Sequence, residues 1–194
     1  LAGSRGASDP VAAAAGMAQK CLVPAGGVPM LCRVLYTLVA SPGIGRIFVT
    51  LQDPSAIAGD AELQRRLGPR VELVAGDTTP SLSVVAVIAR MPEPFPLLVT
   101  TADHPLLTPE MVGHFLDAAA NSGADVTAGL TSSGVLLASY PESKRTWLRF
   151  RDERYSGANL FALITPEAMA AVHFWRRVEA DRKQPWRIAR AFGL

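Results

Sequence analysis

Asp103 is the sharpest candidate for chemistry in this 194-residue sequence, because it closely follows an apolar run over residues 96–101. In α/β sheets ligands bind at the carboxyl ends of the strands, where such a carboxylate would lie. Its hard oxygens suit Mg²⁺, which binds through one or two carboxylates together with substrate phosphates. The alternative is a structural role, since aspartate is also a favourable helix cap. His104, a lone histidine beside a turn, is more often a hydrogen-bonding structural group than a ligand contact.

A glycine-rich loop opens the chain and carries one arginine and one lysine. The residues Leu1-Ala2-Gly3-Ser4-Arg5-Gly6 have the character of a buried strand that ends in this loop, and the tail of the loop runs over residues 20–27. Glycines let backbone N–H groups approach an anion, while Arg5 and Lys20 supply positive charge, so the loop suits a polyphosphate. It is neither a Walker A loop nor the G-x-G-x-x-G of a Rossmann turn. An ordinary surface turn is the alternative.

A basic segment in the second half is the other candidate anion site. Residues 144–154 include Lys144, Arg145 and three further arginines, and they could hold the phosphate of a second substrate. The alternative is a solvated strand edge whose charges discourage pairing with another chain. Asn159 is polar just before an apolar run, so it either hydrogen-bonds a ligand hydroxyl or completes a turn.

Strands that alternate with helices must position these residues. In the first half the apolar patterns predict helices over residues 30–39, 56–67, 82–90 and 109–120, and strands over residues 44–51, 71–75 and 96–101. This alternation indicates βαβ units and a mainly parallel sheet, which would bring the opening loop, the turn at residues 76–80 and Asp103 to one edge. The second half is expected to be rich in hairpins, with strands over residues 124–130, 135–138, 146–150 and 157–163, then helices over residues 166–183 and 185–191.

Composition excludes several classes of protein. Hydrophobic residues make up 49% of the chain and charged residues 19%, which is typical of a compact globule and not of disorder. A net charge of +2 is too small for a general nucleic-acid binder, and no apolar run approaches the ~20 residues that span a membrane. Cys21 and Cys32 make neither a disulfide framework nor a metal set, so we expect a cytoplasmic protein. Cys21 is expected to be a small buried thiol.

Two of these segments, in this order, resemble the MobA-like nucleotidyltransferases. Residues 1–6, then Lys20 and residues 24–31, are similar to the family's L-A-G-G-x-S-x-R-M-G, lysine and G-x-P-L-L. Residues 101–107, Thr-Ala-Asp-His-Pro-Leu-Leu, resemble its metal-binding segment with a D-x-P-L-L core. The turn over residues 79–84 resembles the segment that reads the base in related cytidylyltransferases. The resemblance covers residues 1 to about 163.

The resemblance implies a Rossmann-like GT-A fold, a three-layer α/β/α arrangement that residues 1–194 would form as one domain. It also implies Mg²⁺-dependent transfer of a nucleoside monophosphate from an NTP to a phosphorylated acceptor, with release of pyrophosphate. Carried over by position, Asp103 would bind Mg²⁺, and Arg5 and Lys20 would hold the triphosphate. The implied nucleotide-binding residues are Leu1, Ala2, Gly3, Ser4, Arg5, Gly6, Lys20, Ser81, Ser83 and Asp103, and the expected acceptor-binding residues are Lys144, Arg145 and Asn159.

The sequence departs from the family pattern around the loop. Lys20 lies well beyond Gly6 instead of a few residues after it, because residues 9–16 form an insertion. No second metal-binding aspartate follows Asp103 in a suitable context, and both ends suggest missing flanks. Two other functions stay open: a GT-A glycosyltransferase, which would require an Asp-x-Asp where Ala102-Asp103-His104 stands, and a nucleotide-binding protein without catalysis.

Overall fold

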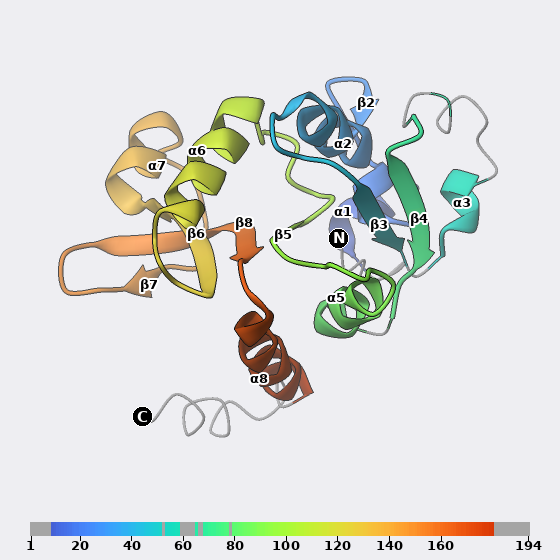
Figure 1. The fold of residues 1–194 in the computed structure, drawn as a ribbon. Helices are drawn as coiled ribbons and strands as arrows, with labels where there is room; N and C mark the ends of the chain where they lie inside the picture. Colours follow the sequence, from blue (N-terminus) through green and yellow to red (C-terminus); the bar gives the residue numbers. More distant parts are fainter. Residues whose placement is uncertain (1–8, 52, 59–64, 66–67, 78, 181–194) are drawn as a thin grey trace.

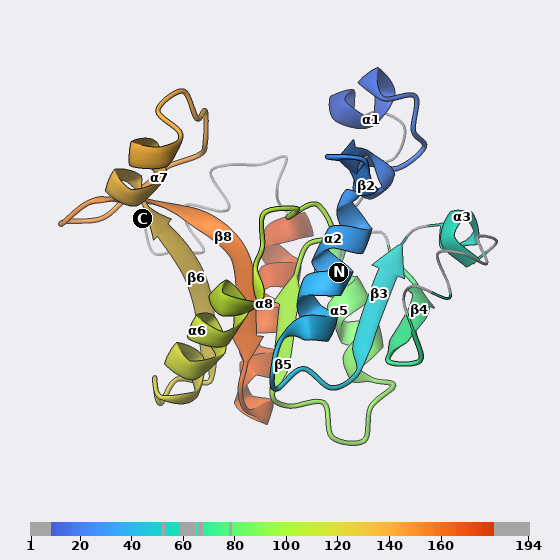
Figure 2. The same ribbon diagram turned by 90° about the horizontal axis from the view of Figure 1, so that it is seen from above.

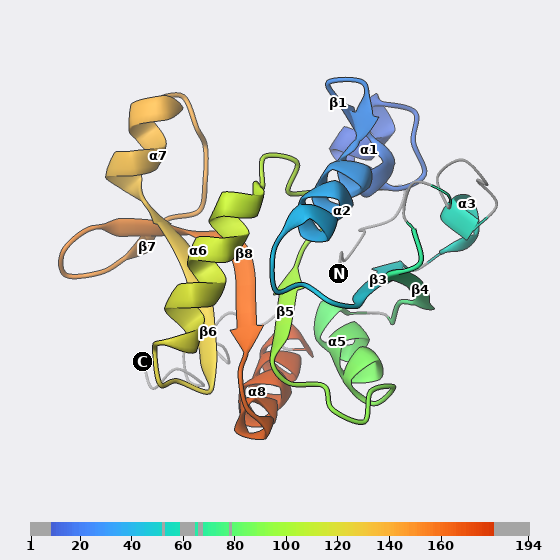
Figure 3. The ribbon, with the colours of Figure 1, turned by 45° about the horizontal axis from the view of Figure 1, so that its top comes forward.

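The computed structural model describes residues 9–51, 53–58, 65, 68–77 and 79–180. Helices cover both faces of the strands, so the molecule has three layers, α/β/α (Figure 1). Helices α2 and α6 lie on one face, and α5 and α8 lie on the other (Figure 3). The strands are β1 (Pro24–Ala25), β2 (Val28–Pro29), β3 (Ile47–Leu51), β4 (Val71–Ala75), β5 (Leu97–Thr100), β6 (Val126–Ser132), β7 (Leu148–Arg149) and β8 (Arg154–Leu163). The helices are α1 (Pro10–Ala14), α2 (Met30–Ala40), α3 (Ser55–Ala58), α5 (Pro80–Ile88), α6 (Pro109–Ala120), α7 (Ser133–Ser139) and α8 (Met169–Ala180), with short 3₁₀ turns η2 (Lys20–Leu22) and η3 (Pro166–Ala168).

Parallel and antiparallel pairing divide between the two halves of the chain. Strands β3 and β4 pair in parallel, from Ile47 opposite Val71 to Leu51 opposite Ala75. Strand β8 pairs antiparallel with β5, β6 and β7, so it is the centre of the second half. Among the described strands, parallel pairing is therefore limited to the first half, because β8 returns beside β5 in the opposite direction. The mixed α/β fold class is as expected.

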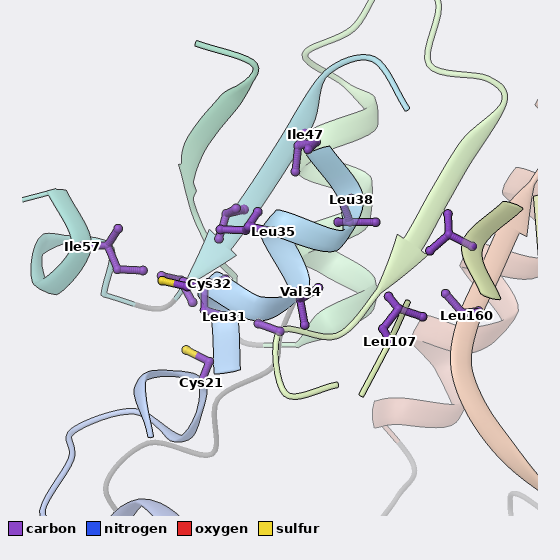
Figure 4. Close-up of a cluster of buried hydrophobic side chains, with 14 residues drawn as sticks. Cys21, Leu31, Cys32, Val34, Leu35, Leu38, Ile47, Ile57, Leu107 and Leu160 are labelled. Atoms are coloured by element: carbon purple, nitrogen blue, oxygen red, sulfur yellow. The ribbon is translucent and has the colours of Figure 1, made fainter. Parts of the chain in front are cut away.

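The core is built around helix α2. Its apolar residues recur at helical spacing, so one face of the helix carries Leu31, Val34, Leu35 and Leu38, all 4% exposed or less. Figure 4 shows these side chains pointing toward Ile47 of β3 and toward Leu107 and Leu160. On the other face of the strands, Phe48 of β3 packs with Val87 of α5. Every residue of β3 is buried, as expected for a strand covered by helices on both faces.

The carboxyl ends of β3 and β5 point to the same edge of the molecule. The β1–β2 hairpin and α1 project beyond this edge on one side, and α7 with the β7 hairpin projects on the other (Figure 2). Two arms built from distant parts of the chain therefore flank the edge where ligands bind in α/β folds.

Most expected elements are present, and one is of the wrong type. Strand β4 and helix α6 occupy the predicted ranges, residues 71–75 and 109–120. Residues 135–138 were expected to be a strand but lie in helix α7, which Ser132 caps by accepting a hydrogen bond from the Val135 N–H at 3.3 Å. The strand expected over residues 146–150 is reduced to β7. The helix expected over residues 185–191 and parts of those over residues 56–67 and 166–183 lie outside the described residues.

Gly76 follows β4 and lies against the end of β3. Its N–H donates to the Leu51 carbonyl at 2.7 Å, and a Cβ at this position would lie 2.9 Å from the Leu51 carbonyl carbon. Because that neighbour is backbone in a buried strand, we expect Gly76→Ala to lower the free energy of unfolding by about 1–3 kcal/mol. Gly113→Ala is the matched control: Gly113 lies within α6 with open space around it. That substitution should stabilise by about 0.5–1 kcal/mol. Urea unfolding of the two variants measures the difference, and equal stabilities would contradict the prediction.

Candidate functional site

Lys20 and Asp103 meet at the carboxyl end of β5. The Lys20 Nζ lies 2.6 Å from the Asp103 Oδ2, although the two residues are 83 positions apart in the chain. Lys20 comes from η2, just before the β1–β2 hairpin, and Asp103 comes from the turn after β5. The structure therefore brings together two of the three residues predicted to be catalytic.

The backbone that carries Lys20 is held at three points. The Gln19 side-chain amide donates to the Asp53 carbonyl at 2.8 Å, and the neighbouring Cys21 is 3% exposed. The β1–β2 hairpin that follows turns at Gly26 and Gly27, whose φ angles of 60° and 76° suit glycine. Arg33 of α2 donates to the Ala25 carbonyl at 2.5 Å and so fastens the hairpin to the core.

Asp103 is fixed by the turn that carries it and not by capping a helix. Ala102 is fully buried, and the Leu107 N–H donates to the His104 carbonyl at 3.1 Å. Thr37 of α2 donates to the Leu107 carbonyl at 2.8 Å, which ties the turn to the core. The cap of α6 is Thr108, which accepts from the Met111 N–H. The helix-cap alternative for Asp103 is therefore wrong.

Asp103 is negatively charged in this environment. Its burial favours the neutral form, but the hydrogen bond from Lys20, further hydrogen bonds within the turn and the positive charge of Lys20 together outweigh burial, so the pKa of Asp103 lies below its usual value. The pKa of His104 is also lowered, first by burial and then by the positive charge of Arg145, which keeps its imidazole neutral. Among the described residues, the His104 Nδ1 is a buried polar atom with no hydrogen-bond partner. A neutral imidazole with a free nitrogen thus lies beside the charged carboxylate.

Two residues from the second half of the chain lie close to the turn after β5: Arg145 acts on His104 by its charge, and Asn159 lies beside the end of β5. The Arg145 guanidinium donates to the Ser156 hydroxyl at 2.8 Å and to the Gly157 carbonyl at 2.9 Å, so it is held against β8. Leu160 pairs with Thr100, which places Asn159 beside the point where β5 ends. Asn159 is exposed with φ 54°, a left-handed conformation that asparagine tolerates. Lys144 is exposed next to Arg145.

The two serines expected to contact the nucleotide are buried at the start of α5. Ser81 is fully buried and Ser83 is 6% exposed. The Ser83 hydroxyl accepts from the Asp77 N–H at 2.9 Å and donates to the Thr79 carbonyl at 3.1 Å, so it closes the turn. Thr79 caps α5 by accepting from the Leu82 N–H. A nucleotide contact from Ser81 or Ser83 stays a prediction, and in this structure the Ser83 hydroxyl bonds within its own turn.

The first part of the expected loop cannot be placed. Residues Leu1, Ala2, Gly3, Ser4, Arg5 and Gly6 lie outside the described residues. The insertion that follows them is helical, because Asp9 caps α1 by accepting from the Val11 N–H at 2.9 Å. Ala12 of this helix is fully buried, so the insertion packs onto the protein.

The donor set fits a metal held mainly by substrate. In the part of the chain that the structure describes, no three His, Cys, Asp or Glu side chains lie together as metal ligands would. Asp103 offers one ionised carboxylate that is 30% exposed, and this is enough for Mg²⁺ when phosphate oxygens and water complete its coordination.

A cavity of about 400 Å³ lies elsewhere, between the beginnings of β3 and β5. Its lining includes Ile44, Phe48, Val87 and Leu97 but neither Lys20 nor Asp103. Because ligands in α/β folds bind at the carboxyl ends of the strands, we assign the site to the edge with Asp103 and not to this cavity.

Three solved structures have a fold similar to that of this chain. A hypothetical transferase from Thermus thermophilus is 27% identical with a TM-score of 0.73, over 97% of this chain and 73% of its own. The 4-diphosphocytidyl-2C-methyl-D-erythritol synthase of Anaerococcus prevotii is 16% identical with a TM-score of 0.61, over 80% of this chain and 68% of its own. A CMP:2-keto-3-deoxy-manno-octonic acid synthetase complexed with CTP is 13% identical with a TM-score of 0.59, over 90% of this chain and 80% of its own. The chain thus shares its α/β fold with these three structures.

The family follows from the sequence match. The model of the MobA-like NTP transferase domain matches residues 2–177, and the chain belongs to this family. The protein is therefore a nucleotidyltransferase, as the resemblance predicted. No curated protein matches the chain. None of the described helices is long and apolar enough to cross a membrane.

Sequence reasoning did not find the residues that position the site. Gln19, Arg33 and Thr37 each bond a backbone carbonyl of a distant or neighbouring loop. Nothing in their types or spacing distinguishes them from other surface polar residues. Only the folded chain shows their role.

Proposed function

We propose that the protein is a Mg²⁺-dependent nucleotidyltransferase that transfers a nucleoside monophosphate from an NTP to a phosphorylated acceptor and releases pyrophosphate. The observation that carries this proposal is the contact between Lys20 and Asp103 at the carboxyl end of β5. A metal–triphosphate complex needs a carboxylate to bind the metal and a positive group to bind the phosphates, and both kinds of group lie at this strand end. We further propose that residues 1–194 act as a single domain.

Each residue has a role that follows from its charge. Bound Mg²⁺ would neutralise phosphate charge as it builds up during transfer. Asp103 would hold the metal, and Lys20 and Arg5 would hold the triphosphate, with the backbone of residues 1–6 close to it. Because these groups are placed before reaction, positioning and electrostatics provide most of the rate acceleration.

The acceptor would bind on the side of β8. Arg145 is held rigidly by Ser156 and Gly157, so its guanidinium can present its remaining N–H groups to a phosphate without first losing side-chain freedom. Lys144 adds a second charge, and Asn159 offers an amide beside the end of β5. This arrangement would place an acceptor phosphate opposite Lys20, across Asp103.

A nucleotide screen tests the proposal. We expect one NTP, with Mg²⁺, to raise the melting temperature by about 5–10 °C at a hundredfold excess over its Kd. Mg²⁺ alone should have little effect, because the site offers one protein carboxylate. Differential scanning fluorimetry of the four NTPs, with and without Mg²⁺, measures the shift, and a pyrophosphate assay on the best nucleotide then tests candidate acceptors. If none of the four shifts the melting temperature, the proposed function is wrong.

A further inference from the structure

The Asp103 oxygen that contacts Lys20 belongs to the carboxylate expected to hold the metal. Lys20 Nζ lies 2.6 Å from Asp103 Oδ2, a distance typical of a strong charge-assisted hydrogen bond. An ammonium group and a divalent cation repel each other, so each weakens the binding of the other to one carboxylate. A cation that binds the Asp103 Oδ2 would therefore displace Lys20 from this contact.

We propose that Lys20 is an exchangeable counter-ion of Asp103: it neutralises the carboxylate until a divalent cation arrives, and then moves to the triphosphate. The proposal rests on the proposed function for its second step only. Before the metal binds, an uncovered Asp103 would repel the incoming triphosphate. Lys20 removes that repulsion, and once released it supplies its charge to the phosphates.

The surroundings allow the side chain to move while its backbone stays in place. The Lys20 and Asp103 side chains are 33% and 30% exposed, so a hydrated cation can reach the pair from solvent. The residues on both sides of Lys20 are fixed, since Gln19 is 6% and Cys21 is 3% exposed. The flexible four-carbon stem of lysine can therefore change its partner without rearrangement of the loop.

The alternative is a fixed ion pair that only tethers η2 to the turn after β5. The two possibilities differ in the sign of one effect. If Lys20 competes with the cation, its removal strengthens metal binding, whereas the loss of a tether loosens the site and weakens it.

A titration with Mn²⁺, followed by electron paramagnetic resonance, distinguishes the exchangeable counter-ion from the fixed tether. It uses the full chain without nucleotide. We expect Lys20→Gln to bind Mn²⁺ roughly twofold to fivefold more tightly than the unaltered protein, which is the size expected for removal of a partly exposed ion pair. Lys20→Arg keeps the charge and should bind Mn²⁺ as weakly as the unaltered protein. Asp103→Asn should lose Mn²⁺ binding. The control for net charge is Arg90→Gln, which removes an exposed arginine just after α5.

The outcomes separate this inference from the proposed function. Unchanged or weaker Mn²⁺ binding by Lys20→Gln would overturn the exchange. An equal gain in Mn²⁺ affinity in Arg90→Gln would overturn it too, because the gain would then come from net charge alone. The exchange would also be overturned if neither Lys20→Gln nor the unaltered protein bound Mn²⁺. If Lys20→Gln gains Mn²⁺ affinity but no NTP binds the unaltered protein, the competition stands and the nucleotide function fails. If both hold, Lys20→Gln should bind the NTP more weakly while it binds Mn²⁺ more tightly.

Discussion

Replacing Asp103 with asparagine is expected to lower the rate of pyrophosphate release by about 100- to 1,000-fold, the size seen when one well-placed electrostatic group is removed from an active site. Asparagine has nearly the same shape as aspartate but no charge. It would therefore keep the turn after β5 and lose the anion that attracts a metal. The release is measured at saturating NTP, Mg²⁺ and acceptor.

Stability provides the control for this substitution. The ion pair with Lys20 is about one third exposed, so its loss should cost no more than about 1 kcal/mol, and the variant should remain folded. Asp117→Asn, on the exposed surface of α6, should leave the rate and the melting temperature unchanged. A folded Asp103→Asn variant that keeps full activity would remove Asp103 from the site.

Cys21 is expected to react with iodoacetamide at least about 100-fold more slowly than an unfolded cysteine at pH 7.5. Burial, with a smaller contribution from the negative charge of Asp103, raises the pKa of the Cys21 thiol to about 11. Because the thiolate is the reactive form, its population at pH 7.5 is lower by more than two orders of magnitude than in a free cysteine with a pKa near 8.5. The rate should rise about tenfold per pH unit up to pH 10, and mass spectrometry of the labelled peptide measures it.

Urea is the control for this measurement, because it should restore the ordinary reactivity of Cys21. The thiol of Cys32, which forms no disulfide, is also buried at 3% exposure, so both cysteines should stay unlabelled in the folded protein. Fast labelling of Cys21 alone at pH 7.5 would contradict the prediction, and would mean that the loop carrying Lys20 opens often.

The sequence was sufficient where local pattern and chain direction decide the structure. Helix α6 and strand β4 have clear periodicity and clear stop signals, and both occupy the predicted residues. The opening loop and Asp103 were expected at one edge, and Lys20 of that loop contacts Asp103 across 83 residues. The role of Arg5 in holding the triphosphate stays a prediction.

The sequence was insufficient where packing decides. Residues 135–138 are short and apolar, a pattern that fits a strand or a helix, and the cap from Ser132 decides for α7. Arg145 was one of several arginines in a basic segment, and its importance depends on the register that brings Ser156 and Gly157 within reach. The register of a strand is set by its pairing with strands far away in the sequence, and local sequence patterns do not contain that information.

The central position of β8 has a consequence for how the protein is made. Among the described strands, β5 and β6 each pair with β8, yet β8 is residues 154–163 and leaves the ribosome after both. Until then, β5 and β6 present unpaired edges on the nascent chain, the condition in which partly made domains aggregate. The turn that carries Asp103 follows directly on β5, so this turn lies beside an unpaired strand edge until β8 has been made.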